Sequence, residues 1–275
     1  MILDVFDVEH GACALITTQG SRHILIDCGH NGTTGWQPGS ALLARGISEI
    51  ERLIVTNYDE DHVSGFQNLM GSVIVRGLQR NGNVNANQIA YLKSDDGIGA
   101  GVQGVADSFS YFSGPPLPVA IDDIQIASFS HPPGNPPFGF DDENNLSLVV
   151  FVTCGTHRIV FPGDTERAGW LAHLRNGAFV AQLAGVTIFV ESHHGRMNGF
   201  CKEALDLCPN IRAFVVSDKK TGFQSQETNH LYRPYAAGFE YDGQRRHILT
   251  TRRDGSMRFS IPPLGGAGVW LGLAA

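Results

Sequence analysis

The segment Thr56-Asn57-Tyr58-Asp59-Glu60-Asp61-His62-Val63-Ser64-Gly65 places three acidic residues and a histidine at consecutive positions. It follows directly on the apolar run Leu53–Val55, which predicts a strand that ends where the acidic residues begin. Carboxylate and imidazole side chains after a buried strand are poor core formers, but they are suitable ligands for Zn²⁺, Mn²⁺ or Fe. An isolated acidic run is also typical of a solvated loop that caps a helix, so the rest of the chain has to decide.

Three further polar clusters border predicted strands. Glu143-Asn144-Asn145 precedes a strand, Gly163-Asp164 follows the strand His157–Phe161, and His193-His194 follows the strand Val186–Val190. Alone, the histidines could be one core and one surface residue, and Gly163-Asp164 could be an ordinary turn. Together they indicate a metal site, because strand ends gather at one edge of a layered α/β protein. Two ions about 3.5–4 Å apart need a bridging carboxylate, for which Asp164 is the natural candidate.

The composition excludes several classes of protein. Of the 275 residues, 42% are hydrophobic and 17% are charged, which favours a globular chain over a disordered one. The net charge of −7 gives no basic surface typical of nucleic-acid binding. We see no apolar stretch long enough to span a bilayer, and the N-terminus is acidic where a signal peptide is basic. We therefore expect a cytoplasmic protein without a membrane partner, in which the five cysteines form no disulfide framework.

The order of the predicted elements indicates the architecture. Both halves of the chain run from strands into alternating strands and helices, which predicts one domain over residues 1–275, a sandwich of two mixed sheets with outer helices. Residues 79–118 are the least regular part, with one helical candidate at Asn87–Lys93, and we interpret them as an insertion or lid near the site. Near the end, Arg246–Thr251 and Met257–Ile261 flank an Asp-Gly turn, which predicts a hairpin.

The order and spacing of these clusters resemble the metallo-β-lactamase fold, an αββα sandwich. Within that fold, the chain is similar to the branch of the ComEC hydrolase domain and the choline-phosphate esterases, in which the ligand pattern is HxDxDHxGG. The resemblance extends to about residue 261 and is specific as a set. It is carried by Leu3-Asp4-Val5 with Gly11, Leu25–Gly29, Thr56–Gly65, Asn145–Val149, Phe161–Asp164, His193–Gly195 and Thr250–Gly255.

The resemblance implies a first metal site. Asp61 and His62 match two ligands of the branch, and one of His193 and His194 matches a third, with His193 favoured. These three side chains would hold one well-bound ion.

The resemblance also implies ligands for a second ion. Asp59 and Asp164 would contribute to it, with Asp164 as the bridge, and Asn145 is a further candidate ligand. Asn57, however, stands where the branch has its first histidine. Because a neutral amide oxygen is a poor ligand for zinc, we expect the second ion to be weakly bound, oxygen-preferring or absent. The expected cofactor is one or two ions of Zn²⁺ or Mn²⁺.

The resemblance further implies a metal-dependent hydrolase, specifically a phosphodiesterase acting on a nucleotide or nucleic-acid phosphate. A bound metal ion would lower the pKa of water to about 7 and so supply hydroxide at neutral pH. Asp61 and Asp164 are the expected catalytic carboxylates, and the loop residue His230 is a candidate for protonating the leaving group. The net charge of −7 favours a small nucleotide or short single strand over a duplex. The candidate phosphate contacts, each of which could equally be solvated surface charge, are Lys219, Lys220, Arg158 and Arg233.

Two alternative functions stay open on the sequence. A hydrolase of carboxylic esters, amides or lactones would use the same chemistry with a different pocket, lined by residues 79–118 and 131–142. A non-catalytic binding protein is the other alternative, because Asn57 replaces a ligand histidine. Metal content and substrate preference discriminate between the three.

Overall fold

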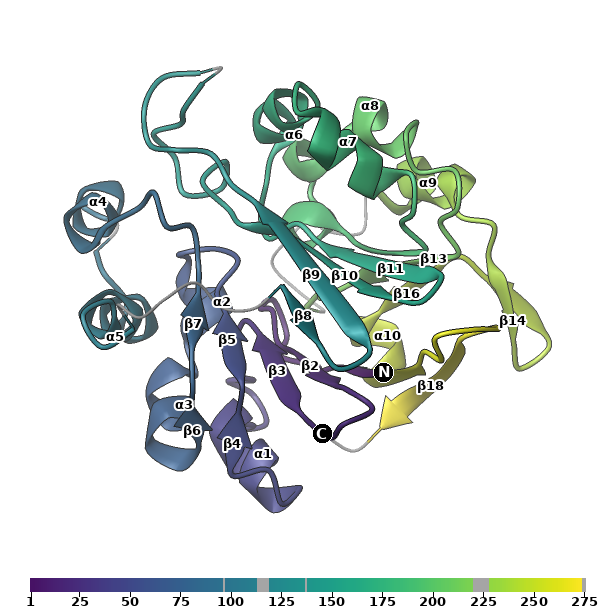
Figure 1. Ribbon diagram of the computed structural model, residues 1–275, viewed down its shortest axis with the longest axis horizontal. Coiled ribbons are helices and arrows are strands. Elements are labelled where there is room, and N and C mark those ends of the chain that lie inside the picture. The colour runs from purple at the N-terminus through teal and green to yellow at the C-terminus, as the bar shows by residue number, and fades with distance from the viewer. Residues whose placement is uncertain (96, 113–118, 137, 220–227, 274–275) are drawn as a thin grey trace.

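Two mixed sheets face each other at the centre of the molecule (Figure 1). The computed structural model describes residues 1–95, 97–112, 119–136, 138–219 and 228–273. The first sheet contains β1 (Ile2–Val5), β2 (Ala14–Thr17), β3 (His23–Ile26), β5 (Arg52–Ile54), β7 (Leu78–Gln79), β17 (Ser256–Ser260) and β18 (Gly268–Leu273). The second contains β8 (Ala120–Ile121), β9 (Ile124–Phe129), β10 (Val149–Cys154), β11 (His157–Phe161), β12 (Ile188–Val190), β13 (Ala213–Val216) and β16 (Ile248–Thr250). The strand orders are β18-β17-β1-β2-β3-β5-β7 and β16-β13-β12-β11-β10-β9-β8.

The strands are apolar on both faces because both faces are buried. In β10, Val150 and Val152 point into the core between the sheets, whereas Val149 and Phe151 point into the layer under the outer helices. The same alternation divides β3, where Leu25 faces outward. Two separate two-stranded sheets are formed by β4 (Glu49–Ile50) with β6 (Ile74–Val75) and by β14 (Phe239–Tyr241) with β15 (Gln244–Arg246).

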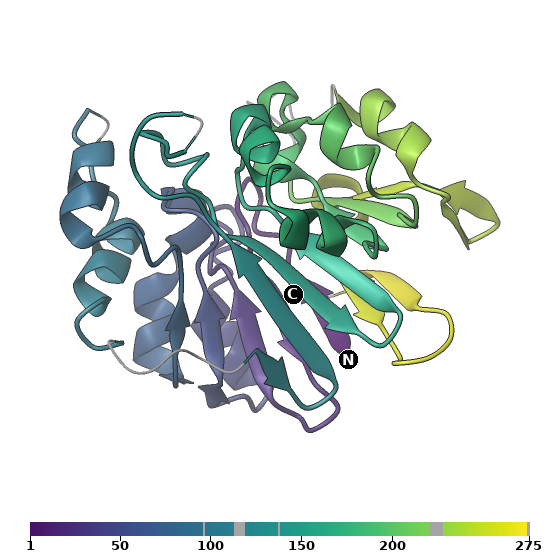
Figure 2. The ribbon, with the colours of Figure 1, turned by 45° about the horizontal axis from the view of Figure 1, so that its top comes forward.

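Helices cover both outer faces of the sheet pair (Figures 1 and 2). On the first sheet lie α1 (Pro38–Ala44), α2 (Glu60–Val63), α3 (Phe66–Ser72), α4 (Ala86–Leu92) and α5 (Ala100–Ser108). On the second lie α6 (Arg167–His173), α7 (Gly177–Leu183), α8 (Lys202–Leu205) and α9 (Asn229–Tyr232). One hydrophobic layer lies between the two sheets, and one lies between each sheet and its helices. The predicted αββα sandwich of two mixed sheets is therefore confirmed.

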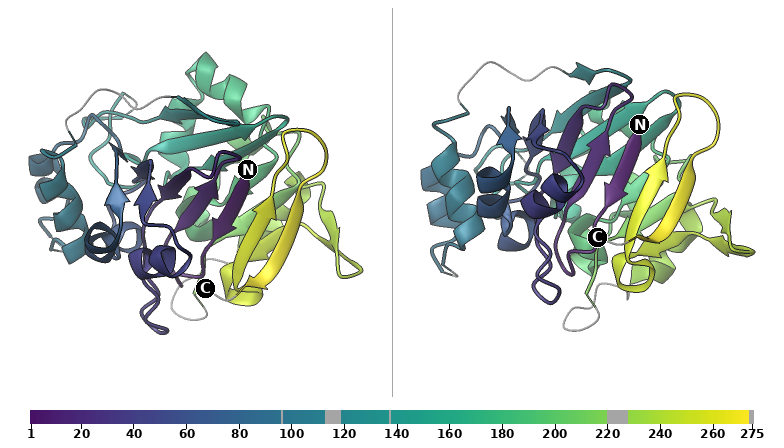
Figure 3. Two further views of the ribbon diagram at one scale, coloured as in Figure 1. Left: turned by 60° about the horizontal axis from the view of Figure 1, so that its bottom comes forward. Right: turned by 90° about the horizontal axis from the view of Figure 1, so that it is seen from below.

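The predicted C-terminal hairpin is wrong. β16 pairs in parallel with β13 in the second sheet, whereas β17 pairs antiparallel with β1 in the first. Between them lies the helical turn α10 (Thr251–Asp254), whose first backbone groups are capped by the Thr250 side chain, which accepts from the Arg253 N–H at 3.2 Å. This turn carries the chain from one sheet to the other, and Figure 3 shows β17 and β18, in yellow, beside the N-terminal strands. Local pattern cannot tell which sheet a strand joins.

The segment 79–118 is more regular than predicted, because it contains α4 and α5. Asn85 forms a capping box at the start of α4, and the Glu60 carboxylate accepts from the Gly101 N–H at 2.9 Å at the start of α5. The glycines of α5 make its sequence resemble a loop. Gly101 is required there because a Cβ at this position would lie 2.3 Å from the Val63 carbonyl oxygen. The described part of this segment is therefore anchored on the acidic motif.

Two expectations drawn from composition can be compared with the structure. All five cysteines are free and buried. Within the part of the chain that the structure describes, none of the helices has the length and apolar character required to cross a membrane.

His173 makes the stability of the fold sensitive to acid. Its ring stacks on Phe179 at 4.6 Å and on His131 at 3.8 Å, and burial lowers the pKa of His173 to about 2. The unfolded chain takes up a proton near the ordinary value of 6.5, but the folded protein does not. The stability that comes from burying neutral His173 is therefore fully present above pH 6.5. Below that pH the free energy of unfolding falls, by up to about 1.4 kcal/mol per pH unit.

We expect His173→Phe to reduce this loss, because phenylalanine keeps the stacking and cannot be protonated. Urea unfolding between roughly pH 4.5 and 6.5 should give a shallower dependence of the free energy of unfolding on pH than in the wild type. Equal slopes in the two proteins would contradict the assignment.

Candidate metal centre

His62 and Asp164 meet at the edge of the two sheets. His62 lies in α2, directly after β5, and Asp164 follows β11 through Gly163, whose φ of 57° allows the sharp turn. The His62 Nε2 atom lies 3.0 Å from Asp164 Oδ1, and both side chains are buried. The outer nitrogen of His62, Nδ1, lies 3.0 Å from Asp27 Oδ2.

Asp27 orients His62, and it is absent from the ligands that the sequence predicts. Its backbone has a positive φ of 55°, which turns the side chain beneath the site at the end of β3. The carboxylate also accepts from the Thr56 N–H at 2.7 Å and from the Thr56 hydroxyl at 2.5 Å. Because Asp27 holds His62 through Nδ1, the other ring nitrogen, Nε2, is directed to the site where a metal ion would bind. The signal was present, because Asp27 ends a strand inside the segment Leu25–Gly29 that carries the family resemblance.

His194 faces two carboxylates. It lies in the 3₁₀ turn η1 (Ser192–Gly195) with φ 53° and ψ 29°. Its Nδ1 lies 3.2 Å from the Ser217 carbonyl, to which it donates, so Nε2 is the nitrogen that would bind a metal ion. Nε2 lies 3.3 Å from Asp61 Oδ2 and 3.6 Å from Asp164 Oδ1. It is buried and has no hydrogen-bond partner of suitable geometry among the described residues.

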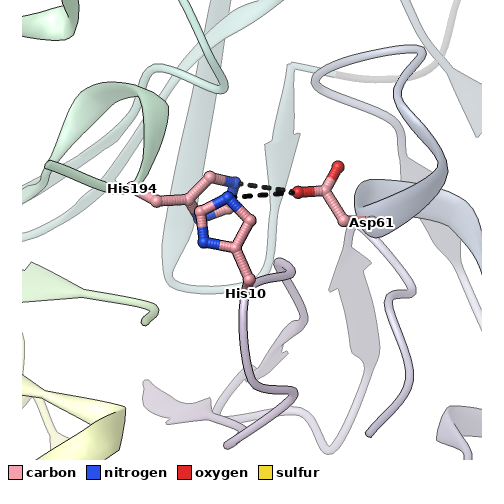
Figure 4. A group of neighbouring side chains, drawn as sticks. All are labelled: His10, Asp61 and His194. Carbon is pink, nitrogen blue, oxygen red and sulfur yellow. Dashed lines mark ion pairs between the residues drawn. The ribbon is translucent and has the colours of Figure 1, made fainter. Parts of the chain in front are cut away.

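These side chains form two overlapping groups of potential ligands for a divalent transition-metal ion. Two groups of potential ligand atoms, each within 4.8 Å, share His194: one contains His62 and Asp164, and the other contains His10 and Asp61. Figure 4 shows His10, Asp61 and His194 directed toward one another. Two imidazoles and two carboxylates are a common ligand set for Zn²⁺ or Mn²⁺. His10, which the sequence did not single out, stacks on His194 with ring centres 4.3 Å apart.

The buried imidazoles and carboxylates of the centre shift one another's pKa values. Burial alone would raise the pKa of Asp164, but the neighbouring His62 and His194 outweigh it and hold the pKa well below its usual range. Burial would lower the pKa of His62 and of His194, yet Asp164, with Asp27 and Asp61, raises both. In the metal-free protein, the imidazoles thus retain protons that a divalent ion would replace.

His193 lies at the edge of this cluster, with Nε2 3.9 Å from Asp164 Oδ2, and its closest polar contact is with Arg196. The Arg196 guanidinium donates to His193 Nε2 at 3.0 Å and to His10 Nε2 at 2.9 Å. His193 Nδ1 lies 3.6 Å from Glu166 Oε1, and burial lowers the pKa of His193. Although the sequence favoured His193 as the ligand, the geometry brings His194 to the carboxylates.

The residues expected around a second ion do not fit one. The Asn57 side chain accepts from the Asp59 N–H at 2.7 Å and donates to Ser147 Oγ at 3.0 Å. Asn145 accepts from the Gly169 N–H at 2.8 Å and so holds the start of α6. Both amides are buried and engaged within the protein.

Asp59, the third of these residues, is paired with a cation. Its carboxylate contacts the Lys93 ammonium, which also lies 3.0 Å from Glu143 Oε1. Burial would lower the pKa of Lys93, but the charge of Asp59 and the hydrogen bonds raise it, so the ammonium is charged. Burial raises the pKa of Asp59, although Lys93 opposes this effect.

A cleft of about 570 Å³ opens in front of the centre. Its walls include Asp59, Asp61 and Asp164 together with the basic side chains of Arg196 and Lys219. Lys219 is a predicted phosphate contact, and its Nζ lies 3.2 Å from Glu9 Oε2.

His230 is not brought to this cleft. It is exposed and lines a separate pocket with Arg233, so its role as an acid stays a prediction. Arg158 bonds the Thr153 hydroxyl at 2.9 Å on the second sheet, and Lys220 lies outside the described residues.

Comparison with known proteins assigns the fold to a family. A model of the metallo-β-lactamase superfamily matches residues 6–179, and no match was found among curated proteins. Similar solved structures include the metallo-β-lactamase fold protein YhfI from Bacillus subtilis (12% identity, 93% of this chain and 99% of that chain, TM-score 0.48). Another is CmlA β-hydroxylase (11% identity, 94% and 54%, TM-score 0.52). The family model spans more than half of the sequence, and the chain belongs to the metallo-β-lactamase superfamily of metal-dependent hydrolases.

Proposed function

We propose that this protein is a cytoplasmic metal-dependent phosphodiesterase that acts on a small nucleotide or nucleic-acid phosphate. The observation that carries the proposal is that Asp61 and Asp164 face His194, and His62 faces Asp164, beside a cleft that Arg196 and Lys219 line. The narrower resemblance to the ComEC and choline-phosphate esterase branch supports the choice of a phosphodiester.

The ligand set prepares the centre for hydrolysis. A divalent ion held by these four side chains would supply a Lewis acid that lowers the pKa of a water molecule to about 7. Asp27 fixes the tautomer of His62, and the Ser217 carbonyl fixes that of His194, so both inner nitrogens are aimed before an ion arrives. The lowered pKa values of Asp61 and Asp164 keep both carboxylates ionised at neutral pH.

Two basic side chains among the carboxylates of the cleft could contact an anionic substrate. The planar guanidinium of Arg196 is suited to paired hydrogen bonds with phosphate oxygens, and it is held between His10 and His193. Lys219 adds a second positive charge on the same cleft. An uncharged ester, amide or lactone would gain little from these two groups. The size of the cleft, about 570 Å³, suits a small ligand.

The proposal is tested with bis-p-nitrophenyl phosphate and p-nitrophenyl acetate as paired substrates. We expect turnover of the phosphodiester that is lost on chelation, returns with Zn²⁺ or Mn²⁺, and is absent in Asp164→Ala. Asp206→Ala is the matched control, because Asp206 is an exposed carboxylate on the helical surface paired with Lys202. Turnover of the acetate alone would favour the esterase alternative, and folded protein that binds no metal would exclude both enzymes.

A further inference from the structure

The Lys93 ammonium supplies positive charge where a second ion would be expected. Its Nζ contacts Asp59 and Glu143, and the residue is only 7% exposed. A buried ammonium is tolerated only when carboxylates pair with it. Positive charge therefore already faces Asp59, and a divalent ion brought to the same carboxylate would be repelled by Lys93.

The insertion holds Lys93 in this position. Lys93 ends α4, where its N–H donates to the Ile89 carbonyl at 3.0 Å and its carbonyl accepts from the Gly97 N–H at 2.9 Å. The neighbouring helix α5 is fixed on the acidic motif by Glu60. Because both helices of the insertion are anchored, the ammonium is part of the built site rather than a surface charge.

The consecutive acids of the motif consequently have three different partners. Asp59 pairs with Lys93, Glu60 caps α5, and Asp61 faces His194 in the metal centre. Asp59 lines the cleft, and the Lys93 side chain extends from the end of α4 to contact Asp59. Lys93 thus acts through Asp59, as a positioning residue rather than a catalytic one.

We propose that Lys93 replaces the second divalent cation and keeps the metal centre mononuclear. The amides of Asn57 and Asn145 are consistent with this role, since the oxygen of each already accepts a backbone N–H. The inference rests on the proposed metal centre, but it does not depend on the phosphate substrate.

Metal stoichiometry tests this inference directly. Metal analysis of the purified protein, combined with Mn²⁺ titration followed by electron paramagnetic resonance, should give one equivalent for the wild type. Lys93→Met, which keeps the length of the side chain but removes its charge, should bind a second equivalent of Mn²⁺ beside Asp59 and Glu143. Lys93→Arg should restore one equivalent. Lys202→Met, which removes an exposed lysine paired with Asp206, should also bind one.

Two equivalents in the wild type, or one equivalent in a folded Lys93→Met protein, would overturn the inference. If Lys93→Met does not fold, Asp59→Asn decides, because a mononuclear centre built without Asp59 keeps its single equivalent and a loss of metal would refute the idea. If the wild type binds one equivalent of metal but has no phosphodiesterase activity, the proposed substrate is wrong and the inference about Lys93 is unaffected.

Discussion

His194→Ala is expected to remove the bound metal ion and to lower the turnover of a phosphodiester by at least about 10³-fold, since a metal ion supplies several kcal/mol of transition-state stabilisation. The His194 Nε2 atom is the one that both groups of potential ligands share, and it faces Asp61 and Asp164 at 3.3 and 3.6 Å. Alanine removes this nitrogen and leaves the two carboxylates with one imidazole fewer to balance them. Metal analysis and steady-state kinetics of the same preparation measure both effects.

His193→Ala is the matched comparison for this prediction. His193 is adjacent in sequence and equally buried, but its Nε2 accepts from Arg196. We expect His193→Ala to keep its metal ion. Retention of metal by His194→Ala together with its loss from His193→Ala would reverse the assignment of the ligand.

Asp27→Asn is expected to weaken metal binding by about 10–100-fold. Asp27 would act on the metal ion indirectly, through its contact with His62. An amide in this position no longer offers two carboxylate oxygens to the Thr56 N–H, the Thr56 hydroxyl and His62 Nδ1. The loss of charged hydrogen bonds in a buried site should also lower the free energy of unfolding by about 2–4 kcal/mol.

Competition with a chromophoric chelator measures the affinity of Asp27→Asn for the metal, and urea unfolding of the metal-free protein measures its stability. Asp107→Asn, which changes an exposed carboxylate that accepts from the Gln103 side chain, controls for the loss of one surface charge. Unchanged affinity in Asp27→Asn would show that His62 does not need its outer carboxylate.

The sandwich could be predicted because its signals are local. Strands such as β10 are nearly continuous apolar runs, and the polar clusters mark the places where strands end. The prediction failed where a strand pairs with another strand that is distant in sequence. β16 and β17 are neighbours in sequence and join different sheets, which pairing with β13 and β1 decides. The helix α5 was missed because its glycines, required by the approach to α2, resemble a loop.

The candidate site divides in the same way. The sequence by itself indicated which residues could act as metal ligands, since Asp61, His62 and Asp164 follow strands that local pattern predicts. Only the tertiary structure decided that His194 rather than His193 faces the carboxylates, that Asp27 orients His62, and that Lys93 pairs with Asp59. The physical reason is that these are distances and orientations between side chains from 34 to 133 positions apart, set by how the sheets and the insertion pack.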